Sequence, residues 1–416
     1  MRVMWICNIP VMKKKKEIGA GVFGGWMSSM ASLLNGRPDI ELMICYPQSE
    51  IKRLTRSNYD GINFCGFYVQ NWNLFEKNVY LELKEIEKKF SPDLIHLFGT
   101  EFPHALSAMK LDPERTLVDI QGLIGVYAKH YFTGLPTSLT SPTPPRFSGR
   151  RTNPIYQDML ALKERGRCEK ATWKRVKYAT GRTEWDYACA KILNPQIEYF
   201  TCNRVLRESF YQNEWSYENC RKYSIMISQA DYPVKGFHIF LKALRILQGR
   251  YSDIRVTVAG RPLNLADPES GTYDSYIKSY MHHYHMEEMV EFTGVLDEQQ
   301  MCERYLQTNV AVVPSLIENA PNSLGEAMIM GVPCVAANVG GVNNLLEHGV
   351  EGFLYQSDAA YMLAHYIGRI FDEYDLVEQF SANARKRACK THDREQNVNE
   401  LLKIYGVVMK NEQGSR

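Results

Sequence analysis

Residues 310–341 read VAVVPSLIENAPNSLGEAMIMGVPCVAANVGG, and this stretch decides the fold. The apolar run 310–313 predicts a buried strand. A loop then carries Glu318, and a helix that contains Glu326 is expected to begin near Asn322. A second apolar run closes the stretch and predicts another strand. A strand, a helix and a second strand in this order are typical of a βαβ unit, so we expect a parallel sheet.

The same alternation extends along most of the chain. Helical patterns, such as those at 79–90 and 237–247, separate short β-rich runs. We expect strands at 2–8, 40–46, 93–98, 116–120, 224–228, 254–259, 290–293, 310–313 and 333–337. Two successive series predict an α/β protein with two Rossmann-like, doubly wound parallel-sheet domains that face each other across a cleft. Ligands bind beyond the carboxyl ends of such strands.

The length of 416 residues suits two domains of about 200 residues each. We predict an N-terminal domain at 1–205, a C-terminal domain at 206–390, and a helical segment at 391–416 that can pack back on the N-terminal domain. Residues 131–151 are rich in Pro, Ser, Thr and Gly, which indicates a long loop inside the first domain. That loop is either a lid on the acceptor side of the cleft or a solvated insertion.

The composition is that of a globular protein, with 45% hydrophobic and 23% charged residues. Ten cysteines without a C-x-x-C pair indicate thiols in a reducing compartment rather than a disulfide framework. No run of 18 apolar residues occurs, so no transmembrane helix is proposed. The first lysines follow the first apolar run instead of preceding it, which is unlike a signal peptide. We therefore expect a cytoplasmic protein.

Two carboxylates, Glu318 and Glu326, flank the expected start of the central helix. The N–H groups of Asn322, Ser323 and Leu324 have no partner within the helix, and the helix dipole favours an anion there, so this end suits a diphosphate. Glu318 can reach sugar hydroxyls, and Glu326 can accept two hydrogen bonds from a ribose. Acidic residues also stabilise helix starts without a ligand, and spacing alone leaves that alternative open.

These residues resemble glycosyltransferase family 4, whose members are retaining transferases of the GT-B fold. The family's Glu-x7-Glu signature is present from Glu318 to Glu326 and is followed by Gly331-Val332-Pro333. Val234-Lys235-Gly236-Phe237 resembles the start of the first helix in the family's second domain. Phe292-Thr293-Gly294 resembles the strand end near the nucleobase. The resemblance covers nearly the whole chain and is most specific in its C-terminal half.

The resemblance implies that the second domain binds a nucleotide-sugar donor. Lys235 would neutralise the charge that grows on the diphosphate as the glycosidic bond breaks. Glu318 is also expected to be a catalytic residue. Glu326 and Gly294 would contact the nucleoside. The family commonly has an arginine near the position of Ser228-Gln229 in this chain, and Arg261 is the candidate for the missing charge.

In the first domain, the resemblance singles out further positions. Gly24 and Gly25 match a glycine pair at which the backbone approaches the donor closely. His96 is expected at the carboxyl end of its strand as a catalytic residue, and a core histidine is the alternative. Gln121 stands where the family usually has an active-site histidine; it can bind a sugar or acceptor hydroxyl but cannot take a proton. The charged residues of 182–186 favour structural ion pairing over acceptor contact.

The chain contains no Asp-x-Asp pair, which metal-dependent transferases use to hold a divalent ion on the diphosphate. We therefore expect neither a metal nor another cofactor, and the donor is expected to be a UDP- or GDP-sugar. The acceptor implied by the resemblance is a glycan or a lipid-linked molecule.

Charge is distributed unevenly along the chain. Residues 1–200 carry 28 Lys and Arg against 20 Asp and Glu, whereas residues 201–416 carry 21 against 27. The basic half suits peripheral contact with the inner face of a membrane, although ordinary surface variation explains the difference equally well. The basic runs lack interleaved aromatic residues and a recognised module, so nucleic acid is not an expected partner.

The sequence thus predicts a retaining, metal-independent glycosyltransferase of the hexosyl type, which would act in the synthesis of surface polysaccharide or glycolipid. Two alternatives stay open. Gln121, Gln229 and Asn344 depart from the family pattern, as they would in a catalytically degenerate sugar-nucleotide-binding protein. A nucleotide-sugar epimerase of the same fold is the other, but the Glu-x7-Glu loop argues against it.

Overall fold

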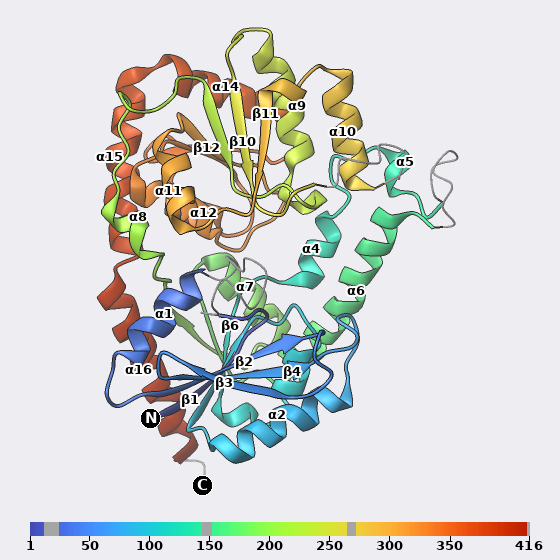
Figure 1. Cartoon of the computed structure of the whole chain (residues 1–416), viewed down its shortest axis with the longest axis vertical. Helices are drawn as coiled ribbons and strands as arrows, with labels where there is room; N and C mark the ends of the chain where they lie inside the picture. Colours follow the sequence, from blue (N-terminus) through green and yellow to red (C-terminus); the bar gives the residue numbers. More distant parts are fainter. Residues whose placement is uncertain (12–24, 144–151, 264–271, 414–416) are drawn as a thin grey trace. The chain divides into compact units, whose positions relative to one another are not determined.

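The computed structural model describes residues 1–11, 25–143, 152–263 and 272–413. Contacts divide the chain into two compact units, each built on one β-sheet (Figure 1). Unit 1 consists of Met1–Ala128, Ala161–Val205 and His392–Arg416, and unit 2 consists of Lys129–Leu160 and Leu206–Thr391.

The sheet of unit 1 has eight strands in the order β3-β4-β2-β1-β5-β6-β7-β8. The strands are Arg2–Ile6 (β1), Glu41–Gln48 (β2), Thr55–Tyr59 (β3), Ile62–Tyr68 (β4), Leu94–Phe98 (β5), Thr116–Asp119 (β6), Tyr178–Gly181 (β7) and Glu198–Thr201 (β8). Every pairing is parallel except that of β3 with β4. Successive side chains alternate between the faces, so Trp5 packs in one core and Met4 and Ile6 in the other.

Helices cover both faces of this sheet. Gly25–Asn35 (α1) and Arg394–Gln413 (α16) pack on the face of Trp5, whereas Lys77–Phe90 (α2) and His104–Ala108 (α3) pack on the opposite face (Figure 1). The Trp5 indole donates a hydrogen bond to the Tyr405 hydroxyl, with 3.1 Å between the two atoms. This bond ties α16 to the first strand. The remaining helices are Ile124–His130 (α4), Pro154–Trp173 (α6) and Glu184–Leu193 (α7), and both α4 and α6 cross into unit 2.

Unit 2 has a six-stranded, fully parallel sheet in the order β11-β10-β9-β12-β13-β14. Its strands are Ser224–Ile227 (β9), Arg255–Ala259 (β10), Val290–Gly294 (β11), Val310–Val313 (β12), Cys334–Ala337 (β13) and Gly352–Tyr355 (β14). Its helices are Thr137–Thr140 (α5), Glu208–Gln212 (α8), Phe237–Gln248 (α9), Tyr273–His283 (α10), Glu298–Leu306 (α11), Asn322–Met330 (α12), Val342–Leu345 (α13), Ala360–Asp372 (α14) and Tyr374–Thr391 (α15). The predicted class, two doubly wound α/β domains, is confirmed.

Five strands were not predicted from the sequence, namely β3, β4, β7, β8 and β14. β3 reads TRSNY and is mostly exposed at the sheet edge, so it lacks the apolar run on which the prediction relied. β7, β8 and β14 were not predicted either, although they are no shorter than β6, β9, β12 and β13, which were.

The sequence analysis placed residues 129–160 in the first domain, but the structure places them in unit 2. The reason is a set of polar contacts with α9. A ring nitrogen of His238 lies 2.8 Å from the Thr133 carbonyl oxygen, and the Lys242 ammonium donates to the Gly134 carbonyl at 2.9 Å. The expected loop also contains α5, and its part at 144–151 lies outside the described residues.

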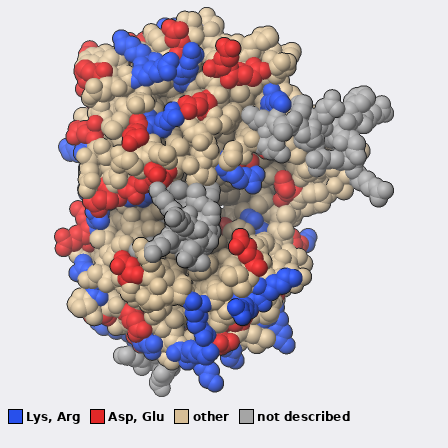
Figure 2. Space-filling view, viewed as in Figure 1, with Lys and Arg blue, Asp and Glu red and all other residues tan. Residues whose placement is uncertain are grey.

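Lys and Arg are interspersed with Asp and Glu on the face drawn in Figure 2. Within the described residues, no helix is both long enough and apolar enough to cross a membrane.

Gly134 holds the 129–160 segment against α9. Its φ is +76°, and a Cβ atom there would come within 2.5 Å of Ile239 Cδ1. We expect Gly134→Ala to lower the free energy of unfolding by about 1–2 kcal/mol, because the left-handed backbone and the contact both resist a side chain. Thermal unfolding and the rate of proteolytic cleavage within 129–160 would measure this effect.

Gly249→Ala, at the other end of α9, is the matched control. Gly249 has a φ of −72°, and a Cβ atom there would lie 3.7 Å from the nearest backbone oxygen. Equal unfolding temperatures for the two variants would contradict the tight docking of the segment.

Candidate functional site

The sheet of unit 2 has a topological switch point between β9 and β12. From β9 the chain continues outward to β10 and β11, and from β12 it continues the other way to β13 and β14. The loops that follow β9 and β12 therefore diverge and leave a crevice at the carboxyl end of the sheet, where open α/β sheets bind ligands. Lys235 and Glu318 lie on these two loops.

Lys235 and Glu318 form an ion pair across the switch point. The Lys235 Nζ atom lies 2.7 Å from Glu318 Oε1, and the Ser315 hydroxyl donates to the same oxygen at 2.8 Å. Both charged side chains are largely buried. Burial alone would lower the pKa of the Lys235 ammonium, but the carboxylate of Glu318 outweighs it and holds that pKa above its usual value. Lys235 is therefore a fixed positive charge.

Close backbone packing holds this pair. Gly236 has a φ of +69°, and a Cβ atom there would come within 1.8 Å of the Pro314 carbonyl oxygen. The Leu316 N–H donates to the Val234 carbonyl at 2.8 Å, which joins the two loops directly. A third loop contributes Gly340, whose missing side chain makes room for the Glu318 carbonyl. Only glycine fits at both close approaches.

Glu326 has a partner that the sequence analysis missed. Glu326 Oε1 accepts hydrogen bonds from Arg207 Nε at 3.1 Å and from Arg207 Nη2 at 2.9 Å, and both side chains are buried. Burial raises the pKa of the Glu326 carboxyl, and Arg207 opposes this by stabilising the carboxylate. Both Arg207 donors converge on one oxygen, so Oε2 has no partner among the described residues.

The start of α12 differs from the expectation. The N–H groups of Leu324 and Gly325 both donate to the Pro321 carbonyl, at 3.2 and 3.5 Å. The prediction that the N–H of Leu324 is open to a ligand is therefore wrong. Asn322 and Ser323 form the first turn of α12, which begins directly after Pro321.

Gly294 and Arg261 lie at the ends of neighbouring strands in unit 2. Gly294 ends β11 with a φ of +74°, and no atom of the described residues lies within 4 Å of the position that a Cβ would take. Its carbonyl accepts a hydrogen bond from the Gly260 N–H. The Arg261 side chain is 68% exposed, and its Nε lies 3.7 Å from a carboxylate oxygen of Asp231. Arg261 is thus a solvated cation beyond β10.

His96 does not lie at the end of its strand. It occupies the centre of β5, where its Nδ1 atom lies 2.7 Å from the Tyr405 hydroxyl and its ring packs 4.0 Å from that of Phe98. Burial lowers the pKa of His96 to about 3. The expected position at the cleft is therefore wrong, because β5 continues for two residues beyond His96. His96 is a neutral core histidine.

Gln121 follows β6 and donates a hydrogen bond to Asp119, which also accepts from Arg204 at 2.9 Å. Gly25 begins α1, and Gly24 lies outside the described residues. Asp186 accepts hydrogen bonds from the N–H groups of Arg182 and Thr183, which completes a capping box at the start of α7. The Asp186 side chain is thus used locally.

Unit 1 has its own switch point, between β1 and β5. Asn8 follows β1 and Glu101 follows β5, and Asn8 Nδ2 donates to Glu101 Oε2 at 2.9 Å. Asn8 Oδ1 lies 2.8 Å from His104 Nε2. Burial raises the pKa of Glu101 to about 7, although the hydrogen bond from Asn8 opposes this. The family motifs used in the sequence analysis contain none of these three residues.

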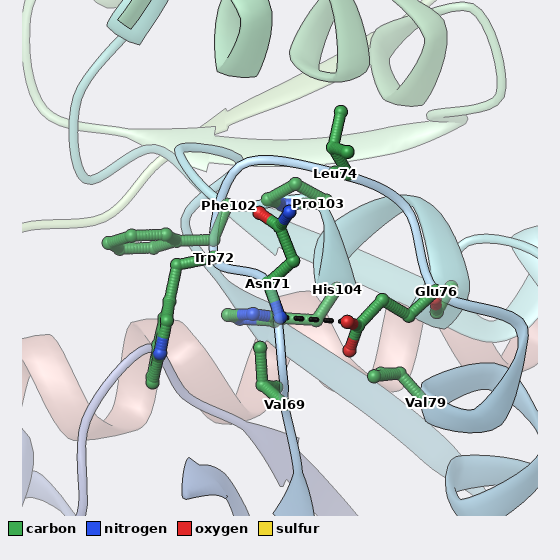
Figure 3. Close-up of a pocket in the computed structure, with 10 residues that line it drawn as sticks. Val69, Asn71, Trp72, Leu74, Glu76, Val79, Phe102, Pro103 and His104 are labelled. Carbon is green, nitrogen blue, oxygen red and sulfur yellow. Dashed lines mark hydrogen bonds between the residues drawn. The ribbon is translucent and has the colours of Figure 1, made fainter. Parts of the chain in front are cut away.

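Beside this network, the loop after β4 closes on the start of α3. Figure 3 shows the rings of Trp72 and Phe102 next to the imidazole of His104, and Glu76 accepting the N–H of Asn71 at 2.7 Å. The recess between them has room for about one water molecule. It fixes His104 rather than holding a ligand. Elsewhere in the described residues, no cluster of three or more His, Cys, Asp and Glu side chains could hold a metal ion.

Comparisons with known proteins relate the sequence and the fold to glycosyltransferases. Residues 213–387 match the family model "Glycosyl transferases group 1". Over 162 residues, 38% of the chain, the protein is 30% identical to the D-inositol 3-phosphate glycosyltransferase of Streptomyces griseus. Over 151 residues, 34% of the chain, it is 28% identical to the amylovoran biosynthesis glycosyltransferase AmsK of Erwinia amylovora. These matches span 33% and 35% of the relatives' own lengths.

Solved structures extend the similarity to both units. The sucrose-phosphate synthase of Thermosynechococcus elongatus superposes with a TM-score of 0.71 at 13% identity, over 99% of this chain and 100% of that one. Anabaena HepE in complex with UDP-glucose gives 0.66 at 14% identity, also over 99% and 100%. Residues 213–387 are therefore similar to the glycosyl transferases group 1 family, and the chain as a whole has the fold of the GT-B glycosyltransferases.

Proposed function

We propose that the protein is a family 4 glycosyltransferase that moves a sugar from a nucleotide-diphosphate donor to a hydroxyl group with retention of configuration. The observation that carries this proposal is the buried Lys235–Glu318 pair at the switch point of the family-matched domain. A fixed ammonium beside a carboxylate suits a site that must neutralise a diphosphate and bind the hydroxyls of a sugar.

In this proposal, unit 2 binds the donor. The diphosphate lies against Lys235 and the first turn of α12, and the free oxygen of Glu326 accepts from a ribose hydroxyl. A uracil nucleotide is the first choice, because the structural neighbour HepE was solved with UDP and with UDP-glucose. Arg261 is an exposed cation that can add a second contact to the phosphates.

Bond making and breaking occur on one face of the sugar. The bond between the anomeric carbon and the diphosphate oxygen breaks, and Lys235 stabilises the negative charge that develops on that oxygen. The acceptor oxygen then bonds to the anomeric carbon from the same side, and its proton passes to the departing phosphate oxygen. Glu318 holds the sugar through its hydroxyls. This scheme needs no divalent ion, because Lys235 supplies the positive charge.

The acceptor is proposed to be a glycan or a lipid-linked molecule, and the product a surface polysaccharide or glycolipid. The name of the relative AmsK, a glycosyltransferase of amylovoran biosynthesis, supports this class. Gln121 donates a hydrogen bond to Asp119, and as an amide it does not serve as a base.

Substitutions of Lys235 and of Glu318 are expected to have different effects, one on nucleotide binding and the other on turnover. We expect Lys235→Met to weaken UDP binding about tenfold or more, because the ammonium that meets the diphosphate is lost. We expect Glu318→Gln to keep UDP affinity but to lower turnover of UDP-glucose by about 10²-fold. Calorimetry with UDP and the rate of UDP release from UDP-glucose measure the two effects.

Lys242→Met is the control, because it removes a lysine of α9 whose ammonium donates to the Gly134 carbonyl and lies outside the Lys235–Glu318 pair. UDP binding should also survive EDTA. If EDTA abolished UDP binding, or if Glu318→Gln turned over normally, the proposed site would be wrong.

Arg207 is expected to support ribose binding indirectly, because it holds the Glu326 carboxylate that accepts the ribose hydroxyl. Arg207→Met leaves a buried carboxylate without its partner, which costs about 3–5 kcal/mol of stability and favours protonation of Glu326. Discrimination between UDP and its 2′,3′-dideoxy analogue should fall about tenfold in Arg207→Met and in Glu326→Gln. Competition binding with the two nucleotides measures it.

Arg304→Met provides a matched control, since it breaks a more exposed ion pair with Glu291 in the same unit. Unchanged discrimination in both Arg207→Met and Glu326→Gln would exclude the ribose contact.

A further inference from the structure

Two arginines of unit 2 lack the partners that the others have. In the described part of this unit, every arginine except Arg221 and Arg255 lies beside a carboxylate or stacks on a tyrosine ring. Carboxylates are not scarce here, because residues 201–416 carry 27 Asp and Glu against 21 Lys and Arg. Both unpaired guanidinium groups line one recess, so this recess is where unit 2 keeps positive charge without a partner.

The recess lies at the amino ends of β9, β10 and β11 and has a volume of about 170 Å³. Arg221 precedes β9, and its N–H donates to the Gln307 carbonyl at 2.9 Å. Arg255 is the first residue of β10, where it is the register partner of Ser224 in β9. The two guanidinium groups therefore extend from neighbouring strand ends. Lys235 follows β9, so the proposed donor site lies at the opposite end of this sheet.

The recess also contains an uncharged hydrogen-bond donor. Thr257 lies on the same face of β10 as the arginine that begins this strand, and its hydroxyl has no hydrogen-bond partner among the described residues. The carbonyl oxygens at the end of α11 are already occupied. That of Arg304 accepts from the Thr308 hydroxyl at 2.7 Å, and that of Gln307 accepts from the Ser224 hydroxyl at 3.1 Å. These oxygens therefore do not compete for the two guanidinium groups.

Two carboxylates also line the recess, and one of them is neutralised. Glu291 forms a bidentate pair with Arg304, at 2.9 and 2.8 Å, so these two charges cancel. Glu288 has no ion-pair partner among the described side chains and opposes an anion. The unpaired guanidinium groups of Arg221 and Arg255 outweigh this single carboxylate. The recess as a whole therefore attracts an anion.

The size and the rim of the recess indicate what kind of anion fits. Its volume is roughly ten times what one water molecule requires, so a phosphate with an attached group has room. A phosphate accepts several hydrogen bonds at once and pairs with guanidinium groups through parallel N–H bonds. An extended polyanion would lie across the rim, where Glu288 opposes it. A small phosphate ester can instead lie between Arg221 and Arg255.

We propose that this recess is a ligand site of unit 2, separate from the donor site, which binds a small molecule through a phosphate or pyrophosphate group. Arg221 and Arg255 hold the phosphate oxygens, and the Thr257 hydroxyl donates a hydrogen bond to one of them. The inference goes beyond the proposed function, because no step of the sugar transfer uses these residues.

The test measures the two arginines directly in the full chain. Phenylglyoxal modifies accessible guanidinium groups, and peptide mass spectrometry gives the rate at each residue. The probes are inorganic phosphate, pyrophosphate and glucose 1-phosphate, with glucose as the uncharged comparison, at low ionic strength because salt screens exposed charges. We expect at least one phosphate probe, but not glucose, to slow the modification of Arg221 and Arg255 about fivefold or more, because bound oxygens occupy the guanidinium groups. Arg250, whose side chain is 69% exposed outside the recess, should react at an unchanged rate.

Substitutions in the recess should have effects of opposite sign. The probe concentration that protects Arg221 to half gives the affinity of the recess itself. We expect this affinity to fall about tenfold or more in Arg255→Met, which removes a charged donor, and to rise about threefold in Glu288→Gln, which removes the unpaired carboxylate. Both side chains are exposed, so both variants should fold normally, which their unfolding temperatures would verify. Arg250→Met, which removes an exposed arginine outside the recess, is the matched control and should leave the affinity unchanged.

The Lys235→Met chain separates this recess from the donor site, and protection of Arg221 and Arg255 should persist in it. Equal modification rates with and without every phosphate probe, or loss of protection in Lys235→Met, would each overturn the proposal. Protection by heparin but by no small phosphate would also overturn it, because the ligand would then be a polymer. Absence of UDP binding by the unaltered protein would overturn the donor site instead and would leave protection in the recess unchanged.

Discussion

Burying the Lys235 ammonium constrains the arrangement of unit 2. A charge taken out of water costs several kcal/mol unless a partner and further hydrogen bonds replace the lost hydration. Glu318 provides the partner, and Ser315 donates to the same carboxylate oxygen. Three loops must meet for this to happen, and Gly236 and Gly340 permit the meeting. Gly236 and Gly340 thus serve the ion pair, although they contribute no chemical group.

Such a pair contributes little net stability, because desolvation offsets most of the attraction. Its value lies in the site that it keeps ready. Lys235 stays charged and is held in one orientation by Glu318. The Arg207–Glu326 pair differs, because both donors converge on one carboxylate oxygen and leave the other available. The Lys235–Glu318 pair fixes the position of a cation. The Arg207–Glu326 pair fixes the position of a carboxylate oxygen that can accept a hydrogen bond.

The sequence predicted the scaffold of this site better than its contacts. The apolar runs 310–313 and 333–337 became β12 and β13, and the helix between them begins at Asn322 as expected. Glu318 and Lys235 were both singled out, yet nothing in their spacing indicated that they meet, because 83 residues separate them. Arg207 lies 119 residues from Glu326, and only a charged residue directly after the apolar pair 205–206 hinted at burial.

Unit 1 was predicted less well for a different reason. The run Leu94–Phe98 is buried throughout. A histidine in the middle of such a run is expected to be a core residue, because its neighbours on both sides are buried. The family resemblance instead predicted His96 at the carboxyl end of the strand, which is two residues too far along β5. Glu101 lies three residues beyond the strand, in the position where a switch-point residue must be. Its detection required the strand order, which no local pattern supplies.

The two units show how one architecture can carry different side chains at the same place. Each has a parallel sheet, one reversal of strand order, and a side-chain pair that bridges the two loops at that reversal. The sheet fixes where the bridge lies, whereas the loop residues decide its charge. In unit 2 the bridge is an ammonium paired with a carboxylate, whereas in unit 1 it is a carboxyl group that accepts a hydrogen bond from a neutral amide.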